Sequence, residues 1–112
     1  MRPRFVINKG IAKEIIAVSS HFTIGTSYTS AIYNRADRSK KITATATASA
    51  YDDGRPSVTF VFPAYDQSGN DTNALKEGTA TIEIYDNAKN IMVYREDFAI
   101  IRKNSLPISV AS

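Results

Sequence analysis

The sequence predicts an all-β fold, either an antiparallel sandwich of the immunoglobulin-like type or a small Greek-key barrel, with about seven to eight strands. Apolar residues recur with a period of two along most of the 112-residue chain, and no stretch of useful length has the period of an amphipathic helix. Gly, Asn, Asp and Pro interrupt this alternation about every ten residues, which is typical of short strands joined by turns. With 43% hydrophobic and 22% charged residues, the composition is that of an ordinary globular domain.

The first third of the chain predicts two short strands followed by a bent one. Residues 4–7 (RFVI) form a strand that Gly10 would end. Residues 13–18 (KEIIAV) fit a strand or one helical turn, and their isoleucines and valine favour the strand. Residues 21–33 are rich in Thr, Tyr and Ile, and predict two short strands or one strand bent at Gly25.

Residues 41–51 alternate more regularly than any other stretch, with small apolar residues on one side and hydroxyl residues on the other. Residues 57–62 form a further strand, and the Asp-Asp-Gly-Arg-Pro segment between the two predicts a turn. We therefore expect these two strands to pair as a hairpin. The two faces of the first strand are Ile42, Ala44, Ala46, Ala48 and Ala50 on one side, and Thr43, Thr45, Thr47 and Ser49 on the other.

A face made of alanine buries little apolar area per residue, so it packs well only against large side chains. The bulky residues nearby in the sequence are Phe60, Phe62, Tyr51 and Tyr65, and we expect them to lie opposite the alanines. The threonine face is neither charged nor strongly apolar. It either meets solvent or lies against a neighbouring subunit.

The last third of the chain predicts a second hairpin after a long polar loop. Residues 66–75 carry the loop signals, and residues 78–86 alternate again. Residues 91–98 are expected to pair with them, and residues 99–101 to continue that strand after a bend.

We expect one β-sandwich domain, residues 1–103, followed by an extended arm or tail, residues 104–112. Apolar residues near both ends have the spacing of strands, so they could pair with a neighbouring subunit or frame the domain's own sheet. The candidate arm residues are Phe5 and Ile7 at one end and Leu106, Ile108 and Val110 at the other.

No constellation of residues points to catalysis, metal binding or a cofactor. The chain has no cysteine, which excludes a disulfide framework, a thiolate zinc site and a cysteine nucleophile. The single histidine, His21, directly follows Ser20, and adjacent side chains of a strand point to opposite faces. The loop from Asp66 to Asp71 lacks the ligand spacing of a calcium site. We therefore expect a protein that is not an enzyme and has no cofactor.

The beginning of the chain does not read as a targeting segment, because Lys, Glu and Asn break up its apolar residues. Elsewhere no apolar run approaches the roughly 20 residues of a membrane helix. We expect synthesis in the cytoplasm and no membrane partner.

A basic loop precedes the alanine-rich strand, and the formal net charge of the chain is +3. Nucleic-acid-binding barrels combine such charge with aromatic side chains on a strand face, and Tyr33 lies next to this loop. Asp37 interrupts the positive charges, which favours a solvated loop over a nucleic-acid site. The basic residues are Arg35, Arg38, Lys40 and Lys41.

Residues 54–101 combine a strand, a polar loop with a Ser-Gly step, a Leu-x-x-Gly step, the strand ATIEIYD and a closing hairpin. This arrangement resembles the small immunoglobulin-like modules in virion proteins of tailed bacteriophages, which include baseplate and fibre-attachment domains, head-decoration proteins and head–tail joining proteins. The resemblance implies a structural role without catalytic residues and a location in the virion. It also implies that the partners are other virion proteins and copies of the chain itself in a homo-oligomer.

Two other function classes stay open. A sandwich that binds a carbohydrate or another small ligand would use tyrosines exposed on one sheet face, whereas a small barrel that binds nucleic acid would use the basic loop. The tyrosines available to a ligand site are Tyr28, Tyr33, Tyr51, Tyr65, Tyr85 and Tyr94.

Overall fold

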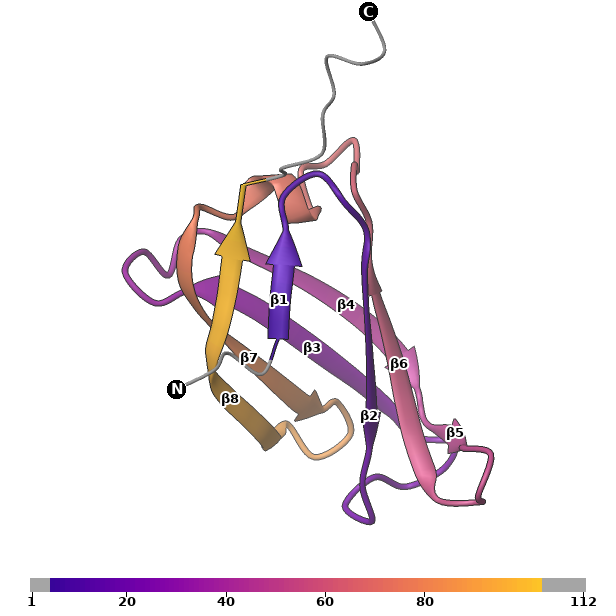
Figure 1. Ribbon diagram of the computed structural model, residues 1–112. Coiled ribbons are helices and arrows are strands. Elements are labelled where there is room, and N and C mark those ends of the chain that lie inside the picture. The colour runs from indigo at the N-terminus through magenta and orange to yellow at the C-terminus, as the bar shows by residue number, and fades with distance from the viewer. Residues whose placement is uncertain (1–4, 104–112) are drawn as a thin grey trace, which may run out of the picture.

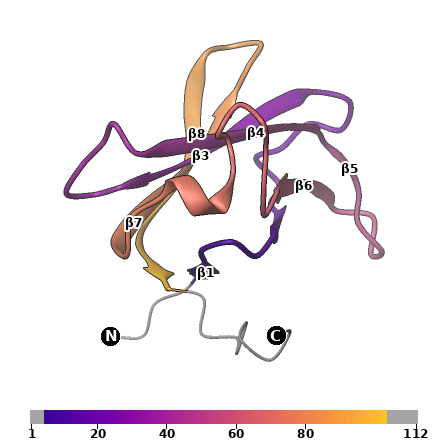
Figure 2. The ribbon, with the colours of Figure 1, turned by 90° about the horizontal axis from the view of Figure 1, so that it is seen from above.

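The computed structural model describes residues 5–103, which form two β-sheets packed face to face (Figures 1 and 2). The elements in chain order are β1 Phe5–Asn8, β2 Lys13–Val18, β3 Ser27–Asn34, β4 Lys41–Thr47, β5 Ser49–Ala50, β6 Pro56–Phe62, the 3-10 helix η1 Thr72–Ala74, β7 Gly78–Asp86 and β8 Ile91–Arg102. The larger sheet has the strand order β1-β8-β7-β3-β4, and the smaller sheet has the order β2-β6-β5.

This strand order is that of an immunoglobulin-like sandwich, which confirms the expected fold class. Strands β2, β6 and β5 take the places of B, E and D, and β8, β7, β3 and β4 those of G, F, C and C′. All pairings are antiparallel apart from that of β1, which runs parallel to β8. Because β1 pairs in the large sheet, the place of strand A beside β2 holds no paired strand among the described residues.

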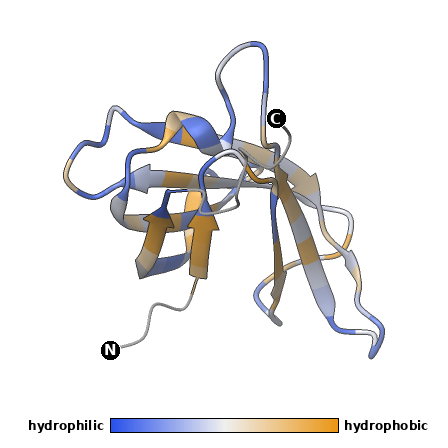
Figure 3. Cartoon of the chain, turned by 45° about the horizontal axis from the view of Figure 1, so that its top comes forward, coloured by the Kyte–Doolittle hydropathy of each residue, from blue (hydrophilic) through white to orange (hydrophobic). Residues whose placement is uncertain are grey.

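The core lies between the sheets and follows the alternation of the sequence. In β7, for example, the inward residues Ala80, Ile82 and Ile84 are at most 1% exposed. Apolar residues gather on the strands, whereas the connecting loops are mainly hydrophilic (Figure 3). The buried apolar residues are Ile7, Ile15, Phe22, Tyr28, Ile32, Ile42, Ala48, Val58, Phe60, Phe62, Leu75, Ala80, Ile82, Ile84, Ala99 and Ile101.

The prediction that residues 41–51 pair with residues 57–62 as a hairpin is wrong for most of its length. β4 pairs with β3 in the large sheet, and only the two residues of β5 pair with β6. The chain changes sheets at Ala48, whose N–H donates to the Thr26 carbonyl at 2.9 Å and whose carbonyl accepts from Gly25. β4 therefore faces β6 across the core instead of lying beside it.

The alanine side of β4 faces the core, as expected. Ala44 and Ala46 pack against the core cluster, and Phe60 and Phe62 of the opposite sheet are fully buried. Tyr51 and Tyr65 do not supply bulk there, because they lie in loops and are 41% and 79% exposed. Two phenylalanines thus provide the volume that the alanines lack.

The stretch 21–33 contains neither two strands nor one strand bent at Gly25, because its one strand starts after that glycine. β3 begins at Ser27, and the residues before it form turns, with Gly25 at φ +93°. The bend expected after residue 98 is confirmed, since the pairing of β8 with β7 shifts by one residue between Ala99 and Glu96. This bulge redirects the end of β8 toward its pairing with β1.

Candidate interaction surfaces

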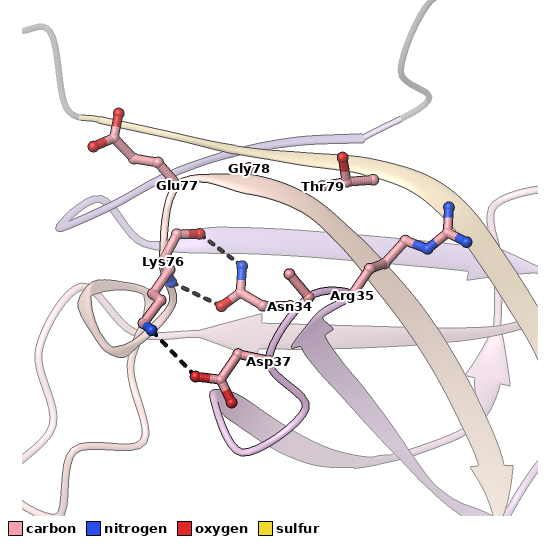
Figure 4. A pocket seen from close by; sticks show the side chains of 8 residues that line it. Asn34, Arg35, Asp37, Lys76, Glu77, Gly78 and Thr79 are labelled. Carbon is pink, nitrogen blue, oxygen red and sulfur yellow. Dashed lines mark hydrogen bonds and ion pairs between the residues drawn. The ribbon is translucent and has the colours of Figure 1, made fainter.

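The loop between β3 and β4 and the segment before β7 border a hollow of about 700 Å³ (Figure 4). Asn34 joins them, because its amide donates to the Lys76 carbonyl at 2.7 Å and accepts from the Lys76 N–H at 2.8 Å. Lys76 Nζ also pairs with Asp37 at 3.2 Å. In Figure 4, Arg35 and Glu77 extend to opposite sides of this joint. The polar groups at the centre of the hollow thus hold the two loops together.

The structure divides the predicted basic loop between two places. Arg35 borders the hollow of Figure 4, whereas Arg38 and Lys41 border a separate pocket of about 250 Å³ on the outer face of the large sheet. The Arg38 guanidinium lies over the ring of Tyr33, 4.7 Å from its centroid, which is a cation–π geometry. Lys40 is exposed and borders neither. The four cations therefore do not line one common pocket.

A hydrogen-bonded set on the outer face of the large sheet, here called the Glu83 cluster, comprises Tyr33, Thr81, Glu83, Tyr85, Arg95 and Asp97. Glu83 is only 5% exposed although its side chain points away from the core. Tyr33 donates its hydroxyl to Glu83 Oε2 at 2.9 Å, and Tyr85 donates to Oε1. The carboxylate raises the pKa of Tyr85, because ionisation would break this hydrogen bond and bring two negative charges together.

Arg95 extends the Glu83 cluster to a second carboxylate. Its Nη1 lies 3.8 Å from Glu83 Oε2, and its Nε donates to Asp97 Oδ1 at 2.9 Å. Thr81 donates its hydroxyl to the same Asp97 oxygen at 3.2 Å. The hydrogen bond from Arg95 is the main reason why the pKa of Asp97 is lowered. The charges of Glu83, Arg95 and Asp97 therefore pair with one another.

Strand β4 forms one edge of the large sheet, and a side chain covers part of that edge. The N–H of Thr43 donates to Asn70 Oδ1 at 2.8 Å, and Asn70 Nδ2 donates to the Thr43 carbonyl at 2.8 Å. The amide of Asn70 thus makes the two bonds that a neighbouring strand would make. Such a cap protects an edge strand from pairing with other chains.

Strand β2 forms an edge of the small sheet, and no other strand within residues 5–103 covers that edge, here called the open edge of β2. Alternate residues of a strand turn their N–H and C=O groups to opposite sides. The Ser19 N–H bonds the Pro56 carbonyl, so the odd-numbered residues of β2 face β6. Glu14, Ile16 and Val18 consequently turn their backbone groups outward, where the described part of the chain provides no strand.

The predicted arm residues fall into two groups. Phe5 and Ile7 belong to the domain's own sheet, where they pair with Ala99 and Ile101 of β8, and Ile7 is fully buried. Of the two alternatives, Phe5 and Ile7 therefore follow the second: they form part of the domain's own sheet. The other candidates, Leu106, Ile108 and Val110, lie outside the described residues, as does the whole of the segment 104–112.

The strongly exposed tyrosines do not form a platform on one sheet face. Tyr28 and Tyr33 are buried, and the Tyr28 hydroxyl accepts from the Thr23 N–H at 2.8 Å. Tyr51 and Tyr65 are the strongly exposed ones, and they lie in different loops. Stacking of a sugar ring needs exposed aromatic faces, so this arrangement gives a carbohydrate site little support.

Within residues 5–103, no group of three or more His, Asp or Glu side chains is placed to hold a metal ion. The same part of the chain contains no helix long and apolar enough to span a membrane. No protein-family model and no curated protein matches this sequence.

Sequence reasoning found the face that carries the Glu83 cluster but not the cluster itself. The alternation in residues 78–86 places Thr81, Glu83 and Tyr85 together on the face opposite the isoleucines. Their partner Tyr33 lies 50 residues away from Glu83 in the chain, and Asn70 lies 27 residues from Thr43. No local pattern marks such distant partners.

Proposed function

We propose that this chain is a non-enzymatic structural module of a tailed-phage virion. It binds other copies of itself and other virion proteins through sheet edges and terminal arms. The observation that carries the proposal is the open edge of β2, whose outward backbone groups can pair with a strand from another molecule. The resemblance of residues 54–101 to phage virion modules supports it, since these residues include all of β6 and β7 and nearly all of β8.

The distribution of edges is consistent with a chain that joins others in a defined way. Asn70 caps the edge of β4, whereas β2 is left open. The cap at Thr43 disfavours pairing along that edge of β4, whereas the backbone groups of β2 can accept an added strand. The paired charges of the Glu83 cluster likewise give the outer face of the large sheet few groups for a reactive site.

Two measurements test this function. Mass spectrometry of purified phage particles should detect the chain at a fixed ratio to the major capsid or tail proteins, and its absence from intact particles would contradict a virion role. Light scattering of the purified full-length chain should give a mass above that of the monomer. A monomer at every accessible concentration would contradict self-assembly.

Nucleic-acid binding is the competing function for the basic loop, and it makes a different prediction. A gel shift at low salt that weakens steeply as salt is added would support it. The separation of Arg35 from Arg38 and Lys41 leads us to expect no such shift.

A further inference from the structure

An apolar groove of about 250 Å³ opens between the two sheets beside β1 and β2. β1 covers only the last four of the twelve residues of β8, from Ala99 to Arg102, so residues 91–98 have no strand on that side among the described residues. The groove lies along this part of β8, which no other described strand covers on that side. Its lining residues are Phe5, Ile15, Ile16, Ala17, Val18, Ser19, His21, Phe22, Ile82, Ile84, Val93 and Tyr94.

The groove and the open edge of β2 form one continuous surface. Ile15 and Ala17 point inward and line the groove, whereas Glu14, Ile16 and Val18 offer backbone hydrogen-bonding groups along its rim. Ile16 is 47% exposed on the outer face of the same strand. A strand added here would gain main-chain hydrogen bonds from the rim and apolar contacts from the groove.

We propose that this surface binds residues 105–111 of a second copy of the chain, which add to β2 as a parallel strand. The segment reads Ser-Leu-Pro-Ile-Ser-Val-Ala, so it has no charge and its larger apolar residues alternate. Residues 1–4 read Met-Arg-Pro-Arg, and two arginines make them a poor match for an apolar groove. This inference rests on the proposed function, because it names the segment and the edge through which copies assemble.

Pro107 determines the direction of the added strand. Proline has no N–H, so its backbone must turn away from β2, and Leu106, Ile108 and Val110 must then turn theirs toward it. In a parallel pair, residues that turn toward a strand lie opposite residues that turn away from it. Leu106, Ile108 and Val110 would then lie level with inward residues such as Ile15 and Ala17 and would enter the groove.

An antiparallel strand would not achieve this. Directly opposite residues in an antiparallel pair turn their backbone groups either both toward each other or both away, and their side chains share a face. Leu106, Ile108 and Val110 would then lie with Ile16 on the solvent side, and the serines would face the groove. The parallel arrangement is therefore the one that matches apolar side chains to the apolar surface.

A second copy is a better source of the strand than the same chain. In Figures 1 and 2, β1 lies between β8 and β2, and the loop from β1 to β2 bridges the two sheets there. That loop is held in place: the Lys9 N–H bonds the Arg102 carbonyl at 2.9 Å, and the Thr72 hydroxyl donates to the Ile11 carbonyl at 3.0 Å. The same chain would have to cross this connection after Arg102, and such crossings are rare. A neighbouring molecule can approach from the open side.

Amide hydrogen exchange of the full-length chain tests the acceptor edge. At high protein concentration, the amides of Glu14, Ile16 and Val18 should exchange about ten-fold or more slowly than at low concentration. The amides of Ile15 and Ala17, which face β6, should not change.

Because the chain lacks cysteine, a nitroxide on Ser112→Cys is a unique label. When the nitroxide-labelled chain is mixed with unmodified ¹⁵N-labelled chain, the nitroxide of one molecule should broaden the β2 amide signals of the other.

Two triple variants test the inserted segment without altering the described fold. Leu106→Asp, Ile108→Asp and Val110→Asp together should weaken self-association at least ten-fold, because each change replaces an apolar side chain that enters the groove with a charged one. Ser105→Asp, Ser109→Asp and Ala111→Asp together are the matched control, since these side chains face away from the groove. The control triple should leave self-association close to that of the wild type. Equal weakening by both triple variants would contradict the assignment of Leu106, Ile108 and Val110 to the side that enters the groove.

The outcomes separate this inference from the proposed function. Self-association without protection of the β2 amides overturns the inference and leaves assembly through other surfaces standing. If the β2 amides are protected equally at all protein concentrations and the nitroxide of one molecule does not broaden the signals of another, the chain's own segment occupies the groove. That outcome overturns the proposal that a second copy supplies the strand. A monomer with unprotected β2 amides at every concentration contradicts both.

Discussion

Replacing Asn70 with alanine should destabilise the domain, although Asn70 lies in a loop outside the hydrophobic core. The change removes the hydrogen bonds in both directions between its amide and the backbone of Thr43, each 2.8 Å long and partly buried. A hydrogen bond of this kind contributes about 1 kcal/mol net, so the free energy of unfolding should fall by about 2 kcal/mol. For a domain of this size the melting temperature should fall by roughly 10 °C.

Urea unfolding followed by circular dichroism measures this loss, and hydrogen exchange locates it. The Thr43 amide should exchange much faster in Asn70→Ala than in the wild type, because its acceptor is gone. Asn70→Asp should be no more stable than Asn70→Ala. Its carboxylate can still accept from Thr43 but cannot donate to the Thr43 carbonyl, and Asp66 lies close enough to accept from the Asn70 N–H at 3.3 Å.

Asn87→Ala provides the matched control. Asn87 also makes hydrogen bonds with both ends of its amide, to Ser27 and Thr29, but these bonds are exposed and water can replace them. Its loss should cost less than about 0.5 kcal/mol. If Asn70→Ala and Asn87→Ala lower the stability equally, the amide of Asn70 does not act as a substitute strand.

Three further predictions concern the core and the titrating groups. Ala48→Leu should lower the free energy of unfolding by about 1–3 kcal/mol, because the buried site lacks room for a larger side chain. Thr47→Leu, at the neighbouring exposed position, should change the free energy of unfolding by less than about 0.5 kcal/mol. Equal losses for the two variants in urea unfolding would contradict this reasoning. Glu83→Gln should bring the pKa of Tyr85 back toward its usual value in a tyrosinate absorbance titration. Because folding raises that pKa, the stability that Tyr85 contributes is present below about pH 10 and is lost as pH rises through the folded-state pKa, so Tyr85→Phe should show a weaker alkaline loss. Hydrogen bonds lower the pKa of four aspartates, so the stability that these carboxylates contribute to the fold is present above about pH 4 and is lost on acidification. The midpoint of urea unfolding should therefore be lower in acid than at pH 7, and an unchanged midpoint would refute this prediction. These aspartates are Asp37, Asp53, Asp66 and Asp97.

The strands and their inward faces could be predicted from the sequence, because the period of two is a local property of extended backbone. In β7 the same alternation that separates Ile82 and Ile84 from Glu83 and Tyr85 in the sequence separates core from surface in the fold. Turn residues located most of the strand ends in the same way. The stretch 21–26 is the exception, because its Thr and Ile residues favour a strand while its contacts form turns.

The candidate surfaces were only partly predictable. The sequence indicated that apolar residues near the ends of the chain could pair as strands, but it did not show that Ile7 is buried in the domain's own sheet. Nor did it indicate that Asn70 caps β4, since an asparagine in a polar loop has the same local signature whether or not it meets a distant strand. These contacts depend on which strands become neighbours.

Local side-chain alternation is enough to show that this chain is built from extended strands and which side of each strand is apolar. Which strands lie side by side depends on packing across the whole domain: β4 joins β3, β1 joins β8, and one edge of β2 is covered by no other described strand. The physical reason is that side-chain alternation records the face of a strand, whereas pairing uses backbone groups that are the same in almost every residue. The neighbour of each strand is therefore chosen by the packing of the whole chain.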